Sequence, residues 1–207
     1  MEKKKEIKKK LNIAIVCDPI LECTGGSFIA TWRFAELLHK KGHKVIFIAA
    51  RSPKNLVDNK YKDIKIYRFR SLLLPKTEGQ FYIAFPTISR LKKILKQEEI
   101  DVLHAAIPTP AAVASIKAAK ALGIKIVAHS HTQPENILLN LPRILARQRI
   151  YKSFYTLLSW IYHHADALVY PTEFARKLLN RLNGDIKNVV ISNGVDMDVF
   201  KKTDTKE

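Results

Sequence analysis

The chain has 207 residues, of which 47% are hydrophobic, and this is enough for the core of one large or two small domains. Its formal net charge of +17 predicts anionic partners such as lipid headgroups, nucleic acid or polyanionic substrates, although a compositional bias toward lysine and isoleucine would produce the same charge. No apolar run approaches the roughly 18 residues of a membrane span, no apolar secretory segment opens the chain, and two cysteines are too few for a disulfide framework, so we expect a cytoplasmic protein.

Residues 1–10 are expected to form a basic tail, because they hold six lysines and two glutamates. The tail contributes +4 of the net charge of +17, so +13 remains without it. Most of the positive charge therefore belongs to the folded body. We expect this charge to favour peripheral contact with the inner face of the cell membrane.

The loop over residues 18–27 is the stretch around which the rest of the chain is organised. It follows residues 11–17, whose β-branched apolar residues predict a buried parallel strand. In open α/β sheets, ligands bind at the carboxyl ends of the strands. Gly25 and Gly26 allow close approach of the backbone, and the N–H groups of a helix starting near Ser27 could face an anion. Paired glycines also serve tight turns that bind nothing, so both interpretations stay open.

Apolar runs alternate with helical patterns along the body of the chain. The helix over residues 27–41 is expected to carry its apolar stripe at Ala30, Phe34, Leu37 and Leu38. Residues 70–86 are expected to be irregular, with more exposed apolar side chains than a connector requires. Strands are expected at residues 11–17, 44–50, 64–69, 101–104, 125–129, 167–170 and 187–191. This alternation predicts an α/β fold with a Rossmann-like, doubly wound, mainly parallel sheet of about seven strands.

Residues 137–164 have a helical pattern that Pro142 is expected to divide. The charged residues in this stretch are all basic, and they are Arg143, Arg147, Arg149 and Lys152. A basic helix with large apolar residues can lie on an anionic membrane, or it can be a core helix with one basic face toward solvent. We expect the second half to be a core helix and residues 142–149 to contact the membrane.

Several common binding patterns do not fit. The glycine pair lies too far from the strand for a dinucleotide-binding turn, and a phosphate-binding G-x-x-x-x-G-K-[ST] loop is missing from the sequence. His104, His129 and His131 share no spacing with a carboxylate or thiolate, so we expect no metal site. Because side chains alternate along an extended chain, His129 and His131 should point the same way. No nucleic-acid-binding module is recognisable, so we expect no nucleic-acid partner.

Six short stretches stand in one order along residues 11–200. They are the Gly25-Gly26 loop, residues 38–45, 100–104, 122–127, 165–169 and 193–200. In this order they resemble the N-terminal domain of family 4 glycosyltransferases, which have the GT-B fold. The loop over residues 129–136 is further similar to members that glycosylate lipids, such as phosphatidylinositol mannosyltransferases and glucosyl-diacylglycerol synthases.

The resemblance implies a retaining transfer of a sugar from a nucleotide-sugar to the hydroxyl of a lipid or glycan acceptor. It implies no cofactor besides the nucleotide-sugar substrate. It places the donor diphosphate against Gly25, Gly26 and Ser27. It makes His131 the catalytic residue beside the acceptor and the sugar, where it would orient the attacking hydroxyl.

The acceptor side of the site is also implied by the resemblance. His129 is a second candidate for the position beside the sugar. Glu135 and Asn136 would contact acceptor hydroxyls, and Arg143 and Arg147 would hold an anionic headgroup by charge-assisted hydrogen bonds.

The family's second, donor-binding domain is expected to begin after residues 11–192, the glycosyltransferase 4-like N-terminal domain. Residues 193–207 would start the interdomain linker, with Asn193, Gly194 and Asp196 as its marked positions. The family's paired glutamates, spaced eight apart, do not occur in this sequence. We therefore expect the chain to be inactive alone and to need a separate C-terminal half. The alternative is a non-catalytic module that binds an anionic membrane or a glycolipid.

Overall fold

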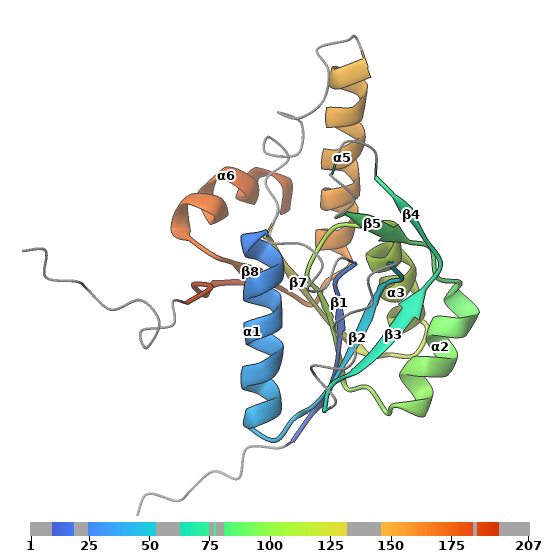
Figure 1. Ribbon diagram of the computed structural model, residues 1–207. Helices are drawn as coiled ribbons and strands as arrows, with labels where there is room; N and C mark the ends of the chain where they lie inside the picture. The colour runs from blue at the N-terminus through green and yellow to red at the C-terminus, as the bar shows by residue number, and fades with distance from the viewer. Residues whose placement is uncertain are drawn as a thin grey trace, which may run out of the picture.

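A seven-stranded sheet forms the centre of the computed structural model, which describes residues 10–18, 25–52, 63–74, 77, 81–131, 146–183 and 186–194 (Figure 1). Every neighbouring pair of strands is parallel, and their order is β3-β2-β1-β6-β7-β8-β9. The strands are β1 (Asn12–Val16), β2 (Lys44–Ala50), β3 (Lys65–Phe69), β6 (Val102–Ala105), β7 (Lys125–His129), β8 (Ala167–Tyr170) and β9 (Asn188–Val190). The prediction of a doubly wound parallel sheet is confirmed.

The direction of winding reverses at β1. From β1 the chain proceeds outward to β2 and β3, and then it returns to β6 on the other side of β1. The loops after β1 and β6 therefore diverge at the carboxyl edge of the sheet. Such a reversal opens the crevice where doubly wound sheets bind ligands.

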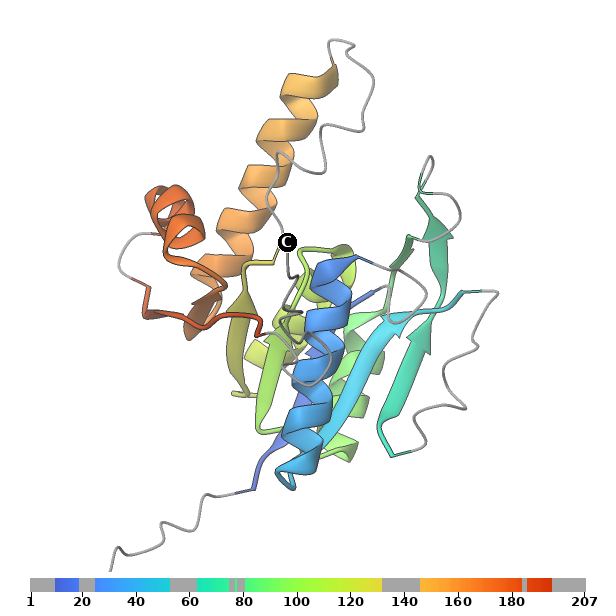
Figure 2. The same ribbon diagram turned by 60° about the vertical axis from the view of Figure 1, so that its left-hand side comes forward.

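Alternate residues of the strands face two separate cores. Ile13 and Ile15 pack with Trp32 and Ala35 of α1 (Gly26–Lys40). The opposite face of the sheet packs against α2 (Ile88–Gln97), α3 (Pro110–Lys120), α5 (Ala146–His163) and α6 (Glu173–Asn183). Figure 2 shows α1 lying across the face of the sheet that is turned toward the viewer.

The predicted apolar stripe of α1 is wrong for Phe34 and Leu37, whereas Leu38 packs against the core as predicted. Phe34 is 40% exposed and Leu37 is 56% exposed, whereas Trp32 and Ala35 are buried. Trp32 stacks on Phe47 of β2, with ring centroids 5.2 Å apart. Both sets of residues have helical spacing, and the larger ring of Trp32 decides which of them faces the core.

The prediction of an irregular stretch over residues 70–86 is also wrong, because this stretch contains an antiparallel hairpin. Its strands are β4 (Ser71–Leu73) and β5 (Tyr82–Ala84). The N–H group of Leu74 donates to the carbonyl of Phe81 and extends the pairing beyond β4. Three-residue strands are too short for a periodic pattern in the sequence.

The second half of α5 is a core helix, as predicted. Leu158, Ile161 and Tyr162 are buried, whereas Lys152 is exposed. The expected division at Pro142 lies outside the described residues. Within the part of the chain that the structure describes, no helix combines the length and the apolar composition needed to cross a membrane.

Candidate active site at the carboxyl edge of the sheet

The amino end of α1 lies at the carboxyl edge of β1. Gly25 is the N-cap in an extended conformation, and it offers no side chain to cap the helix. The first turn of α1 holds no acidic residue, and a Cβ added to Gly26 would meet no atom of the described residues within 4 Å. The first N–H groups of a helix carry partial positive charge. Among the described residues, then, nothing at this helix end competes with a bound anion.

Three histidines form a row of ring contacts beside this edge, in which His129 and His131 are stacked and His104 is tilted against His129, and we call them the histidine stack: His104, His129 and His131. The ring centroids of His129 and His131 lie 3.6 Å apart, and those of His104 and His129 lie 5.7 Å apart. Phe34 of α1 continues the row, with its ring centroid 5.1 Å from that of His104. The prediction that His129 and His131 point the same way is confirmed. The neighbouring strands β6 and β7 bring His104 to them.

All three histidines are neutral near pH 7. Burial lowers the pKa of His131 to about 4. Burial, together with the neighbouring His131, lowers the pKa of His104 to about 4. For His129, burial and then the charges that His131 and His104 would carry lower the pKa to about 2. A neutral imidazole keeps one nitrogen as a hydrogen-bond acceptor, and Nε2 of His129 is buried without a hydrogen-bond partner among the described residues.

Asp18 is a buried carboxyl group that the sequence reasoning did not select. It lies two residues beyond β1 and is completely inaccessible to solvent. Burial raises its pKa to about 7, although the side chain of Thr109 and the backbone of Ala84 offset part of this rise. An acidic residue after an apolar strand was visible in the sequence. Its burial depends on β5 and α3, whose positions the sequence does not reveal.

The remaining predicted site residues are placed only in part. Asn193 and Gly194 are exposed and follow β9, two strands from β7, which corresponds to about 10 Å across a sheet. Glu135, Asn136, Arg143 and Asp196 lie outside the described residues. Arg147 lies in the first turns of α5, where the structure describes the backbone and not the side chain. No group of His, Cys, Asp and Glu in the described part of the chain could hold a metal ion.

The fold and the site together define an α/β domain whose candidate site lies at the carboxyl edge of its sheet. The chain belongs to Glycosyltransferase Family 4, whose family model matches residues 24–199. It is 26% identical over 171 residues to the alpha-monoglucosyldiacylglycerol synthase of Streptococcus pneumoniae. That alignment covers 82% of this chain and 37% of the relative, so the chain spans well under half the length of this relative.

Solved structures confirm the fold. The sucrose-phosphate synthase of Thermosynechococcus elongatus is similar with a TM-score of 0.71 and 13% identity, over 92% of this chain and 50% of that one. The Anabaena protein HepE, solved in complex with UDP and glucose, is similar with a TM-score of 0.58 and 16% identity, over 94% of this chain and 48% of that one. At these identities the likeness is one of fold, and it agrees with one half of the GT-B architecture.

Proposed function

We propose that this chain is the acceptor-binding half of a retaining glycosyltransferase that moves a sugar from a nucleotide-sugar to the hydroxyl of a lipid acceptor. Membership of Glycosyltransferase Family 4 supports sugar transfer, and the glucosyldiacylglycerol named in the pneumococcal relative supports a lipid acceptor. The observation that carries the proposal is the histidine stack at the carboxyl edge of the sheet, linked through Phe34 to α1, whose amino end is open.

The open end of α1 suits the diphosphate of the donor. When the bond between the sugar and the phosphate breaks, negative charge grows on the leaving diphosphate. The N–H groups of Gly26 and Ser27 would stabilise this charge, because they are fixed before the reaction and need no reorganisation. Gly25 and Gly26 place no side chain of their own on this approach.

His131 suits the reacting hydroxyl. It is half-buried, and it is the end ring of the histidine stack because it contacts His129 and follows it in the row that begins at His104. Its low pKa leaves a nitrogen free to accept a hydrogen bond from the attacking hydroxyl, whose proton finally leaves with the diphosphate or with solvent. His129 would hold the ring of His131 in place by stacking. Glu135, Asn136, Arg143 and Arg147 remain proposals for contacts with the acceptor.

The donor's nucleotide would be bound by a C-terminal half, so we expect no transfer by this chain alone. We further propose that the protein works at the inner face of the cell membrane, where a lipid acceptor is available. The non-catalytic membrane module is the weaker alternative, because it gives the histidine stack no role.

A transfer assay tests the proposal. The chain is purified from its native cells together with its stable partners, and it is incubated with labelled nucleotide-sugars and with diacylglycerol or monoglucosyldiacylglycerol. We expect labelled glycolipid whose anomeric configuration matches that of the donor. His131→Ala should lower turnover at least about 100-fold, whereas His163→Ala, an exposed histidine at the far end of α5, should leave it unchanged. Turnover by the 207-residue chain alone would contradict the need for a second half.

A further inference from the structure

The β4–β5 hairpin exposes a row of large apolar side chains, which we call the apolar ridge: Leu72, Leu73, Leu74 and Phe85. Their exposed fractions are 69%, 45%, 38% and 51%. A hairpin in water normally alternates polar and apolar residues, so that one face packs and the other is solvated. Three consecutive exposed leucines break this alternation. Contiguous exposed apolar surface of this kind marks an interaction site.

The ridge occupies both faces of the hairpin. Leu72 lies opposite Ile83, and Leu73 lies opposite Tyr82. Cross-strand neighbours share a face, so Leu72 points to one side of the ribbon and Leu73 to the other. A folded protein partner would cover one of these sides. A fluid apolar phase surrounds both, and this geometry therefore favours the interfacial region of a lipid bilayer.

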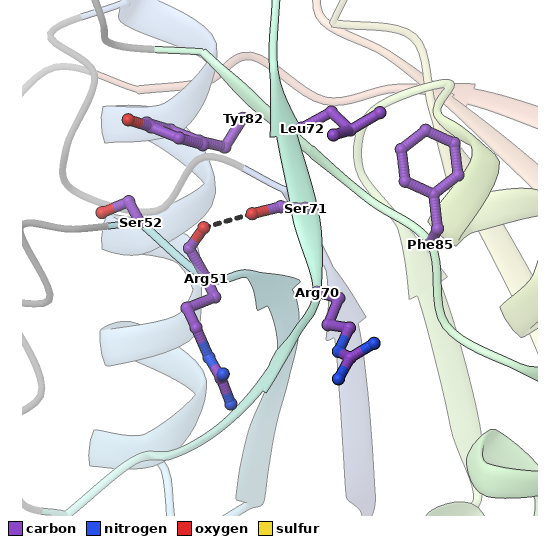
Figure 3. Close-up of a pocket in the computed structure, with 7 residues that line it drawn as sticks. All are labelled: Arg51, Ser52, Arg70, Ser71, Leu72, Tyr82 and Phe85. Atoms are coloured by element: carbon purple, nitrogen blue, oxygen red, sulfur yellow. Dashed lines mark hydrogen bonds between the residues drawn. The ribbon is translucent and has the colours of Figure 1, made fainter.

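Arginines stand where the ridge meets the body of the protein. Arg51 and Arg70 line an open pocket of about 530 Å³ that also includes Leu72 and Phe85 (Figure 3). Figure 3 shows both guanidinium groups directed away from Leu72. The hydroxyl of Ser71 donates to the carbonyl of Arg51 and fixes the root of the hairpin to the loop after β2. In a bilayer, the acyl chains lie deeper than the headgroup phosphates. Apolar side chains that extend past a pair of arginines can therefore reach the acyl chains while the guanidinium groups stay at the level of the phosphates.

The charge around the ridge is one-sided. Residues 68–93, which leave out the Lys65 that pairs with Glu98 at the opposite edge of the sheet, contain six lysines and arginines and a single acidic residue, Glu78. Each cation near an anionic bilayer adds to the attraction. The sign of the charge therefore selects an anionic membrane over a neutral one.

The ridge stands beside the candidate active site. Phe81, which directly precedes β5 at the turn end of the hairpin, packs edge-on against Phe28 in the first turn of α1, with ring centroids 5.8 Å apart. Figures 1 and 2 both show the hairpin rising at the upper, carboxyl edge of the sheet, where the amino end of α1 also lies. A surface that docks through the ridge thus comes close to the site.

We propose that the apolar ridge inserts into the interface of an anionic lipid bilayer while Arg51 and Arg70 bind the headgroup phosphates. The inference rests on the proposed function for one point, which is that the acceptor is itself a lipid. Docking through the ridge would then present the candidate active site to headgroups, and the acceptor would react without leaving the bilayer.

Vesicle cosedimentation with the 207-residue chain tests this inference. The vesicles contain phosphatidylcholine alone or phosphatidylcholine with phosphatidylglycerol. The double variant Leu72→Ser/Phe85→Ser should weaken partition into the anionic vesicles about tenfold or more, because two large apolar side chains no longer enter the bilayer. The matched control is Phe174→Ser/Leu178→Ser on α6, where the exposed fractions are 69% and 42%. This control should leave partition unchanged.

A second pair of variants tests the role of charge. Arg51→Gln/Arg70→Gln should remove most of the preference for anionic vesicles. The control Lys177→Gln/Lys187→Gln removes the same net charge from exposed positions on α6 and before β9. It should reduce the preference for anionic vesicles much less. Thermal unfolding followed by circular dichroism confirms that each variant is folded.

Three outcomes would overturn the inference. They are a wild-type chain that does not bind anionic vesicles, ridge and control variants with equal effects, and a dimer in solution that the ridge variant abolishes. Glycolipid synthesis by the protein purified with its stable partners, measured on the same variants, reports on the proposed function separately. Failure of sugar transfer together with ridge-dependent vesicle binding would reject the proposed function and keep the docking surface.

Discussion

The imidazole rings of His129 and His131 stack with their centroids 3.6 Å apart and their planes inclined by 21°. Burial holds the pKa of both rings far below 6.5, and the pKa of His129 is lowered further by the charge that His131 would carry. Neither ring can take up a proton without placing a poorly solvated charge against its neighbour. The stacked arrangement therefore requires both imidazole rings to be neutral.

Acidification should destabilise the protein through these rings. Between pH 6.5 and about 4, the unfolded chain binds more protons at His129 and His131 than the folded chain, so stability falls as the pH falls. We expect a loss of up to about 1.4 kcal/mol per pH unit for each ring, measured by urea unfolding at pH 7 and pH 5. His129→Phe/His131→Phe should flatten this dependence, and the exposed His163→Phe should not. An unchanged slope in the double variant would contradict the role of the stack.

Asp18 should act in the opposite direction. Burial raises its pKa from 3.8 to about 7, so between these values the folded chain keeps a proton that the unfolded chain has released. The contribution of this carboxyl to stability therefore rises as the pH falls toward 3.8. Asp18→Asn should stabilise the protein by about 2–4 kcal/mol at pH 8, where the wild type buries a charge, and the gain should shrink toward pH 4.

Thermal unfolding of the Asp18→Asn variant across this pH range checks the prediction. Asp63→Asn, at an exposed position, is the matched control and should change the midpoint little at any pH. A stabilisation by Asp18→Asn that is the same at pH 8 and pH 4 would show that Asp18 is not the group that titrates.

The sequence predicted the parts of the site that depend on local geometry. The alternation of an extended chain is enough to put His129 and His131 on one side. The participation of His104 was not predicted, because it requires the pairing of β6 with β7, which the order of elements along the chain does not specify. The burial of Asp18 depends in the same way on contacts with β5 and α3. Phe34 and Leu37 were assigned to the wrong face of α1 because two helical stripes compete, and only packing against Phe47 distinguishes them.

Gly26 should matter for ligand binding more than for folding. It is helical and has open space around it, so Gly26→Ala is expected to raise the free energy of unfolding by about 0.5–1 kcal/mol. In the protein purified together with its C-terminal partner, the added methyl group should lower UDP affinity about tenfold, because it occupies the approach to the first N–H groups of α1. Calorimetry and thermal unfolding measure the two effects.

Gly42→Ala provides the contrast. Gly42 has a φ of 86° after α1, so alanine is strained there and should destabilise the protein by about 1–2 kcal/mol without changing UDP affinity. Equal UDP affinity for Gly26→Ala and the wild type would contradict the proposed position of the donor diphosphate at the amino end of α1.

The amino edge of the sheet, opposite the site, should control stability alone. Glu98 is buried there and binds Lys44 at 3.0 Å and Lys65 at 2.5 Å, and it also accepts a hydrogen bond from the hydroxyl of Tyr67. Burial alone would raise the pKa of Glu98, but the hydrogen bonds from Lys65, Tyr67 and Lys44 lower it to about 2. The carboxylate therefore stabilises the fold above pH 4.5, and this contribution is lost as the pH falls through about 2.

Glu98→Gln should cost about 2 kcal/mol at pH 7, measured by urea unfolding, while UDP and vesicle binding stay at wild-type levels because this cluster lies at the other edge of the sheet. Glu99→Gln, at the exposed neighbouring position, should cost almost nothing, and a similar loss in both variants would mean that the ion pairs of Glu98 are not what stabilises this edge.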